Sequence, residues 1–314
     1  MPDLITIGET MAAFSPEGGL PIRKAPCFHL RIAGAESNTA IGVARLGHTA
    51  GWISRLGKDS FGEYILNTIH KEGVDTSRVT TDTRHSSGIM FKQPNNEDAT
   101  EVSYYRENSA ATYLSKTDID LDYLKSAKVL HITGITPILS EDCNEYVNTA
   151  IETAHANHIL VSFDPNIRLK LWQDNDYRPK LKKIISNSDI VLLGLNEAAQ
   201  LYDTDDVQTI IETIFSHPRV QYIAIKNGST GAWVCSRNEQ HFIEPIPCKS
   251  VDPVGAGDGF NAGFLHGILE GKDIKTCGLY GGIVGALATE TYGDIDGYPV
   301  LTKLQDIANN YNLS

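Results

Sequence analysis

Residues 251–260 read VDPVGAGDGF and run into the small-residue stretch 261–269, which is typical of a helix. Pro253 interrupts any preceding strand, and the glycines after it let backbone N–H groups converge at the first turn of that helix. Free amides and the helix dipole at such a terminus stabilise charge that develops on a phosphoryl group during transfer. The stretch therefore predicts an anion hole made by the amides of Gly255, Ala256 and Gly257.

A carboxylate, Asp258, follows in the same turn, where a bound phosphate would ordinarily repel it. Its position makes sense if it orients an attacking hydroxyl and accepts its proton, as aspartates do where alcohols are phosphorylated. A tight turn with an acidic first helical turn would give the same residues. The stretch alone leaves both interpretations open.

Around this stretch, short apolar runs alternate with longer segments of helical periodicity. This alternation is typical of a parallel α/β sheet with helices on both faces. We expect strands at 4–8, 129–132, 159–164, 190–193 and 222–226. We expect helices at 37–46, 62–71, 141–155, 178–186 and 207–215, with Ser140 capping the third.

One segment breaks the alternation. Residues 88–106 are two strand-like runs on either side of the polar stretch 94–100, which predicts a hairpin with a long tip. Because a hairpin lacks a core of its own, we expect it to project as a flap over the ligand crevice of the main sheet; an ordinary edge hairpin is the alternative. We expect residues 1–314 to form one domain whose lid comes mainly from about 12–33 and 88–107.

The composition narrows the function classes. The chain has 314 residues, 41% of them hydrophobic, which is ordinary for a globular protein. With 39 acidic against 27 basic residues, the net charge of −12 repels nucleic acid. The five cysteines are widely spaced and predict neither disulfides nor zinc, and no apolar window is long enough for a membrane helix. We expect a cytoplasmic protein without nucleic-acid or membrane partners.

Residues 251–260 resemble the second signature of the ribokinase-like (PfkB) carbohydrate kinases, and residues 34–40 (GAESNTA) are similar to the first. Asn196 and Glu197 resemble the family's Asn-Glu pair, which is associated with magnesium and phosphates. Residues 225–232 (IKNGSTGA) resemble its nucleotide loop and do not form a Walker A loop. The resemblance covers nearly the whole chain. It implies a ribokinase-like α/β fold, with a central, mostly parallel sheet, helices on both faces and a small β-sheet lid.

The resemblance also implies a reaction and its residues. ATP would phosphorylate a sugar hydroxyl with Mg²⁺ present, and whether a monovalent cation supports the anion hole stays open. Asp258 would be the catalytic base, with the anion hole beside it. The implied sugar contacts are Gly34, Asn38, Met90, Tyr104, Arg106, Arg168 and Asp258. The implied nucleotide contacts are Asn196, Lys226, Gly228, Gly231, Gly255 and Gly257, and the implied metal ligand is Glu197.

Within the family the chain is most similar to kinases that convert 2-keto-3-deoxygluconate to its 6-phosphate. Arg106 and Arg168 could together hold a carboxylate, because guanidinium groups match carboxylate geometry. Met90 stands where those kinases commonly carry a tyrosine, which weakens the assignment of the sugar. A kinase for fructose or ribose, and a non-catalytic sugar or nucleotide sensor on this fold, are the alternatives. The resemblance also implies a homo-oligomer formed through the lid.

Overall fold

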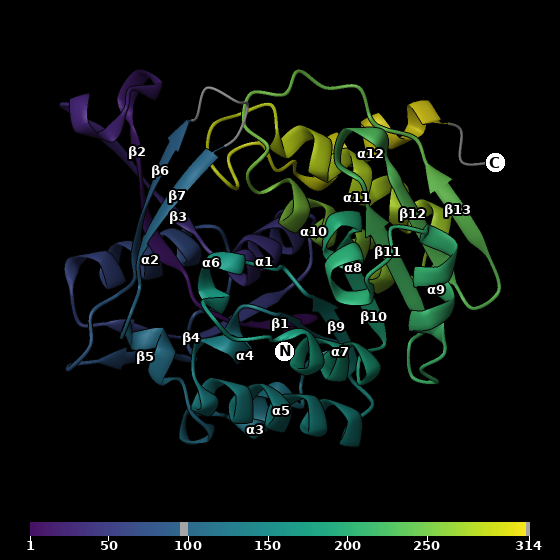
Figure 1. Ribbon diagram of the computed structural model, residues 1–314, viewed down its shortest axis with the longest axis horizontal. Coiled ribbons are helices and arrows are strands. Elements are labelled where there is room, and N and C mark those ends of the chain that lie inside the picture. The colour runs from purple at the N-terminus through teal and green to yellow at the C-terminus, as the bar shows by residue number, and fades with distance from the viewer. Residues whose placement is uncertain (95–99, 312–314) are drawn as a thin grey trace.

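The structure is a computed structural model that describes residues 1–94 and 100–311. Within the described part of the chain, nine strands form one sheet in the order β13-β12-β11-β10-β9-β8-β1-β4-β5 (Figure 1). Neighbouring strands are parallel from β5 to β11, and β12 and β13 add an antiparallel edge. The strands are β1 Leu4–Ile7, β4 Ala50–Gly57, β5 Val79–Asp82, β8 Val129–Thr133, β9 Leu160–Asp164, β10 Ile190–Gly194, β11 Tyr222–Lys226, β12 Ala232–Ser236 and β13 Gln240–Ile243.

Helices cover both faces of this sheet, as Figure 1 shows. Successive residues of a strand serve opposite faces: in β10, Val191 and Leu193 pack in one core, and Ile190 and Leu192 pack in another. This is why the strands read as continuous apolar runs in the sequence. One core includes α5 Glu141–Ala156, α7 Arg178–Ser186, α8 Leu195–Tyr202 and α9 Val207–Phe215. The helices of the opposite face include α1 Ala35–Arg45, α2 Ser60–Lys71, α10 Ala256–Leu269, α11 Ile274–Ala288 and α12 Leu301–Ala308.

Four further strands form a small sheet beside the main one, in the order β3-β2-β6-β7 (Figure 1). Strands β2 and β6 are parallel, and the other pairs are antiparallel. The expected hairpin is present as β6 and β7, and part of its polar tip, residues 95–99, lies outside the described residues. The strands are β2 Met11–Pro16, β3 Phe28–Ala33, β6 Ile89–Pro94 and β7 Thr100–Tyr105. The predicted fold class is therefore confirmed.

The predicted elements agree with the structure to within one residue or two. Ser140 caps α5 as expected, because its Oγ accepts a hydrogen bond from the Cys143 amide at 3.1 Å. Helix α1 begins two residues before the predicted start, since its N-cap is Gly34, which has no capping side chain. Three short helices complete the set of α-helices in the described ranges: α3 Leu121–Leu124, α4 Thr136–Leu139 and α6 Leu169–Trp172.

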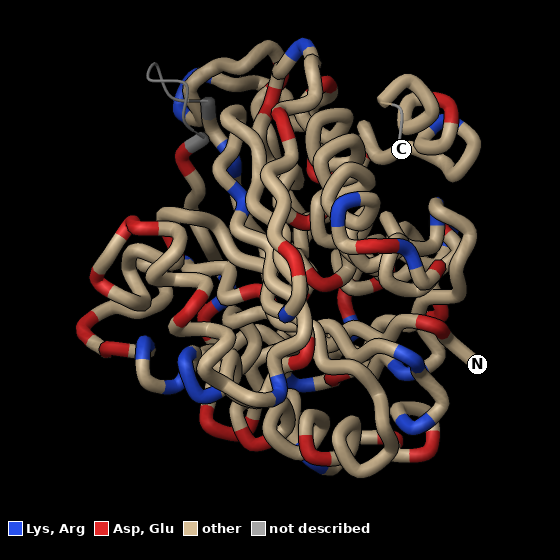
Figure 2. The backbone as a smooth tube through the Cα atoms, turned by 90° about the vertical axis from the view of Figure 1, so that its right-hand side faces the viewer, with Lys and Arg blue, Asp and Glu red and all other residues tan. Residues whose placement is uncertain are grey.

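Charged residues of both signs are interspersed over the molecule, as Figure 2 shows, with acidic residues in excess. None of the helices in the described ranges is long and apolar enough to cross a membrane.

Candidate active site

Side-chain hydrogen bonds join the carboxyl ends of strands β9 and β11 to helix α10. Asp164 ends β9, and its Oδ2 accepts hydrogen bonds from Lys226 Nζ at 2.8 Å and from Asn261 Nδ2 at 2.6 Å. Lys226 ends β11, and Asn261 lies in α10. Burial raises the pKa of Asp164, but the Lys226 ammonium lowers it by more, so the pKa lies below its ordinary value. Side chains thus tie the first turns of α10 to the sheet edge where ligands bind in open α/β folds.

Asp258 lies in the first turn of α10, and only 9% of its surface is exposed. Burial raises its pKa to about 7, and the negative charges of Asp164 and Asp294 act in the same direction. A hydrogen bond from Asn38 and the positive charge of Arg168 oppose this rise. A carboxyl group that titrates near neutral pH is suited to general-base work.

Gly255 caps α10 in a conformation that excludes other residues. Its φ is 82°, and a Cβ on it would lie 2.0 Å from the carbonyl oxygen of Asp294. The hydroxyl of Tyr298 donates to the Gly255 carbonyl oxygen at 2.8 Å. The Ala256 amide donates back to Pro253 at 3.3 Å, whereas Gly257 is exposed beside the Lys226 ammonium. Of the three amides predicted to form the anion hole, that of Ala256 is therefore already bonded within the turn, and the Lys226 ammonium lies beside the exposed Gly257.

The predicted sugar residues Gly34 and Asn38 lie at the start of α1, against α10. Asn38 Nδ2 donates to Asp258 Oδ2 at 2.8 Å and lies 3.3 Å from Asp294 Oδ2. At Gly34 a Cβ would lie 2.6 Å from the carbonyl oxygen of Glu9, so the chain after β1 and the start of α1 approach closely. The two signature stretches, distant in sequence, therefore meet at Asp258.

The predicted sugar residues of the small sheet share one of its faces. Met90 is paired across the hairpin with Tyr104 and is buried in an apolar cluster. Arg106 is also buried, with its guanidinium 5.7 Å from the centre of the Tyr104 ring. Arg106 also forms an ion pair with Oε2 of the buried Glu9, whose Oε1 accepts a hydrogen bond from Ser109 at 2.6 Å. A structural ion pair was the alternative role for Arg106, but its partner Glu9 was not predicted from the sequence.

Arg168, the other predicted carboxylate ligand, is exposed just before α6. Its charge lowers the pKa of Asp258, so its guanidinium acts on the site. The structure brings Asn38 into contact with Asp258, leaves Arg168 near enough for its charge to act on that carboxylate, and gives Arg106 a separate ion pair. A joint clamp of Arg106 and Arg168 stays a prediction.

Apart from Gly255 and Gly257, the predicted nucleotide residues lie at the ends of β10 and β11 or just after them, as does the predicted metal ligand Glu197. Glu197, in the first turn of α8, accepts backbone hydrogen bonds from Ile167 and Gly194, each at 2.7 Å. Burial raises the pKa of Glu197, and the negative charge of Asp164 adds to this rise. Asn196 beside it is exposed. Gly228 and Gly231 form the turn between β11 and β12, with φ values of 53° and 111°.

A model of the pfkB family of carbohydrate kinases matches residues 1–301. The chain belongs to this family. It is 36% identical over 307 residues to a 2-dehydro-3-deoxygluconokinase from Bacillus subtilis, a match that covers 96% of this chain and 94% of that protein. By its family, the protein is therefore an ATP-dependent sugar kinase.

Two solved structures are similar over almost the whole kinase. A PfkB protein from a Polaromonas species has a TM-score of 0.89 at 33% identity, covering 97% of this chain and 99% of that one. A candidate ribokinase II from E. coli, solved with ATP and Mg²⁺, has a TM-score of 0.91 at 26% identity, covering 99% and 100%. The similarity therefore includes both the main and the small sheet.

Helix α11 packs closely on α10 of the kinase. A Cβ at Gly281 would lie 3.0 Å from the Phe260 carbonyl oxygen, and one at Gly285 would lie 3.0 Å from that of Ala256. These glycines let α11 lie close against the first turns of α10.

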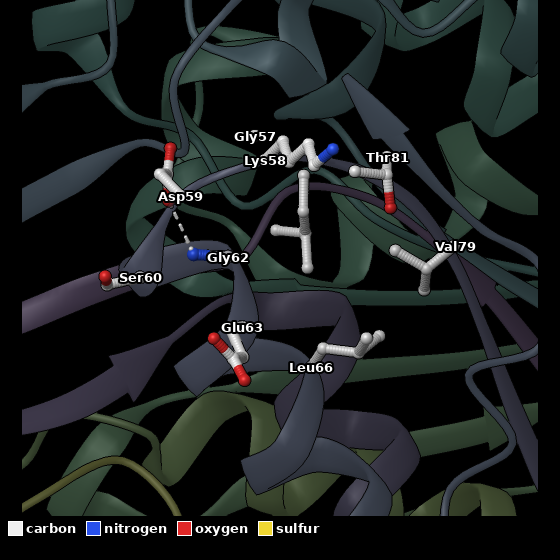
Figure 3. Close-up of a pocket in the computed structure, with 10 residues that line it drawn as sticks. Gly57, Lys58, Asp59, Ser60, Gly62, Glu63, Leu66, Val79 and Thr81 are labelled. Carbon is white, nitrogen blue, oxygen red and sulfur yellow. Dashed lines mark hydrogen bonds between the residues drawn. The ribbon is translucent and has the colours of Figure 1, made fainter. Parts of the chain in front are cut away.

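A hollow of about 400 Å³ lies at the start of α2 (Figure 3). Asp59 caps this helix there, with its Oδ1 2.7 Å from the Gly62 amide nitrogen, and Glu63 and Thr81 lie on the wall. The predicted sugar and nucleotide residues are not among those that line this hollow. We assign it no part in catalysis.

Four polar residues that lie at the candidate site or connect to it were not predicted from the sequence. Asp164 stands at the end of a predicted strand, a usual place for a ligand-binding carboxylate, and this signal could have identified it. Asn261 lies three residues after Asp258 and so within reach on the same helix. Lys92 and Asp294 carry no comparable local signal, because they meet across 202 residues.

Proposed function

We propose that this kinase transfers the γ-phosphoryl group of ATP to the 6-hydroxyl of 2-keto-3-deoxygluconate. The observation that carries the reaction type is the buried Asp258, whose pKa is about 7, at the glycine-rich start of α10. The sugar is supported by the identity to the Bacillus subtilis 2-dehydro-3-deoxygluconokinase, since the two names describe one sugar acid.

In the proposed reaction, Asp258 orients the acceptor hydroxyl and takes its proton while the hydroxyl oxygen forms a bond to the γ-phosphorus. The bond between that phosphorus and the bridging oxygen of ADP breaks, and ADP leaves with the electron pair. The exposed amide end of α10 and the nearby Lys226 ammonium stabilise the charge on the transferred group. In-line geometry comes from holding the sugar against α1 and the nucleotide against the turn after β11.

The residues that would hold ATP and Mg²⁺ lie at the same edge of the main sheet as the start of α10. The turn of Gly228 and Gly231 lies next to Lys226 and faces the same edge as α10. The E. coli relative is solved with ATP and Mg²⁺. Both carboxylate oxygens of Glu197 accept backbone N–H groups, so this residue fits Mg²⁺ held through water better than direct coordination. When bound, Mg²⁺ neutralises phosphate charge.

The carboxylate of the sugar acid would be held by arginine. Arg168 is exposed and acts on Asp258, so it can turn to a ligand without breaking a buried contact. Arg106 is already paired with Glu9 and lies near the Tyr104 ring, so its position is set and its charge is compensated within the chain. We propose that Arg168 supplies most of the electrostatic attraction for the sugar carboxylate and that Arg106 orients that carboxylate.

A neutral sugar is the second candidate, because Met90 offers no hydroxyl and is only 5% exposed within an apolar cluster. A panel of 2-keto-3-deoxygluconate, fructose and ribose with ATP and Mg²⁺, followed by ADP release, separates the two. We expect kcat/KM for the sugar acid to exceed the others by at least about tenfold, the value of one guanidinium contact. Preferred turnover of fructose or ribose would replace the proposed substrate, and no turnover of any sugar would favour a sensor.

The organisation of the protein is part of this proposal. We propose that residues 1–314 form one domain, that the small sheet is its lid, and that lid strands of two copies pair to form a homo-oligomer. The exposed Tyr105 on the edge strand β7 supports this pairing. Use of ATP and the absence of disulfides among the five described cysteines support a cytoplasmic location.

A further inference from the structure

A lysine of the small sheet is buried against the active site. Lys92 lies in β6 and is 6% exposed, and its ammonium forms an ion pair with Asp294 Oδ1. Asp294 is also 6% exposed and lies in the loop after α11. A lysine is rarely buried to this extent without a specific partner. The ion pair joins the small sheet to a loop of the main body.

Asp294 in turn belongs to the surroundings of the base. Its Oδ2 lies 3.3 Å from Asn38 Nδ2, the same nitrogen that donates to Asp258 Oδ2 at 2.8 Å. The Asp294 carbonyl oxygen also packs against Gly255, the N-cap of α10. Lys92, Asp294, Asn38 and Asp258 therefore form one continuous line of contacts from the lid to the base. Asn38 Oδ1, which is buried, has no hydrogen-bond partner within the described residues.

The distribution of charge along this line is uneven. Asp164 is paired with Lys226, and Asp294 is paired with Lys92. Within the described residues, Asp258 has no ion pair, although the negative charges of both carboxylates act on it. Each flanking acid thus has its own lysine, and the base has none. The charged and titratable groups that face Asp258 are Asp164, Arg168, Asp294 and Tyr298.

We propose that Lys92 is a positioning residue for phosphoryl transfer: the small sheet delivers its ammonium to Asp294, which holds the Asn38 amide against Asp258. With Lys92 in place, Asp294 is neutralised and Asp258 ionises more readily. Without it, an unpaired carboxylate faces the base. The surroundings of Asp258 therefore have their full set of charges only when the small sheet lies where it does in this structure. This inference rests on the proposed function, in which Asp258 is the base.

Three variants test the role of the charge. Lys92→Met removes the ammonium with a side chain of similar length, Lys92→Arg keeps a positive charge, and Lys92→Met combined with Asp294→Asn removes both charges. We expect Lys92→Met to move the acid limb of the kcat profile up by about one pH unit, which lowers kcat at pH 7 about fivefold. The double variant should return the limb toward its original position. Lys92→Arg should resemble the unmodified enzyme.

The position of the acid limb separates positioning from structure, because it does not depend on the fraction of enzyme that is folded. A merely structural lysine would lower the yield of active enzyme and leave the limb in place. An unchanged limb and kcat in Lys92→Met would overturn the proposal, as would a double variant that stays shifted.

A second measurement does not need turnover. The carboxyl ¹³C resonance of Asp258, assigned by its loss in Asp258→Asn, gives the titration midpoint of this group directly. We expect the midpoint to rise in Lys92→Met and to return in the double variant. If no sugar is phosphorylated, the proposed function fails while this titration still decides the role of Lys92. A midpoint that does not move contradicts the role.

Discussion

The side-chain nitrogen of Asn38 lies 2.8 Å from the Asp258 carboxylate, across 220 residues of sequence. Asn38 comes from the first turns of α1 and Asp258 from the first turn of α10, so two helix starts point at one site. Helix N-termini carry partial positive charge, which suits a site that binds phosphate and develops negative charge. The hydrogen bond orients the carboxylate without neutralising it.

The pH dependence of turnover should report the buried base. Because the pKa of Asp258 is raised to about 7, the carboxyl group is protonated below that pH and cannot accept the hydroxyl proton. We expect kcat/KM with the preferred sugar to fall about tenfold per pH unit below pH 7 and to level off above it. A profile measured from pH 5 to 9 in constant ionic strength checks this. Activity that stays constant down to pH 5 would exclude a base with this pKa.

Asp258→Asn should lower kcat by about 10²- to 10⁴-fold, since the amide cannot accept the proton. Asn keeps the shape and an acceptor oxygen, so sugar binding measured by calorimetry should change little. Asp252→Asn is the matched control: Asp252 Oδ1 accepts the Val254 amide at 3.1 Å, which an asparagine oxygen also can do. The control should retain activity within about threefold. Equal effects of the two substitutions would remove Asp258 from the reaction.

The two arginines should respond differently to substitution by methionine. Arg168→Met should raise KM for the sugar acid at least about tenfold, with an unchanged melting temperature, because Arg168 is exposed. Arg106→Met leaves the buried Glu9 without its cation, so we expect a loss of about 3 kcal/mol in the free energy of unfolding.

Kinetics with the sugar acid and with a neutral sugar, together with urea unfolding, distinguish these effects. An Arg168→Met enzyme that keeps the wild-type KM for the sugar acid, or whose KM rises by the same factor for both sugars, would show that this residue does not bind the carboxylate.

The oligomer should depend on the outer face of the small sheet. An aromatic cluster of Phe14, Phe28 and Phe91 lies there with Tyr105, which is 64% exposed. Tyr105→Glu places a charge in this cluster and should convert the oligomer to monomers in sedimentation velocity. Tyr311→Glu, a substitution at an exposed tyrosine near the C-terminus, is the control and should leave the oligomer intact. A wild-type protein that sediments as a monomer would contradict the proposed pairing.

The sequence allowed the fold to be predicted because its signals are local. In β10, consecutive apolar residues pack in two cores, so the strand appears in the sequence as an apolar run. Such a run can be recognised without knowing which strands lie beside it. Gly255 and Asp258 were found for the same reason, since a helix start and its acid lie within four residues. The pairing of Arg106 with Glu9 was not predictable, because a single sequence does not show which buried charges meet.

The lid illustrates the same limit. Period-two alternation places Met90 and Lys92 on one face of β6. That face is buried in the structure, but the sequence does not show the burial, so Lys92 does not stand out as unusual there. Its partner Asp294 belongs to a loop rich in glycine and acid residues that reads as an ordinary surface turn. Contacts between the lid and the body are set by tertiary packing, which the local pattern does not encode.

The turn at Gly255 offers a last test, in which backbone strain is separated from contact. Gly255 and Gly271 both have positive φ, 82° and 64°, so alanine is strained at either position. A Cβ at Gly271 meets nothing within 4 Å, whereas one at Gly255 would lie 2.0 Å from the Asp294 carbonyl oxygen.

Gly271→Ala should therefore cost about 1 kcal/mol in the free energy of unfolding and leave kcat unchanged. Gly255→Ala should cost about 1–3 kcal/mol more, because the Asp294 loop must move. That movement also displaces the groups around Asp258, so kcat should fall at least tenfold. Urea unfolding and initial rates on both variants check this, and equal kcat values would mean that the Asp294 loop does not support the base.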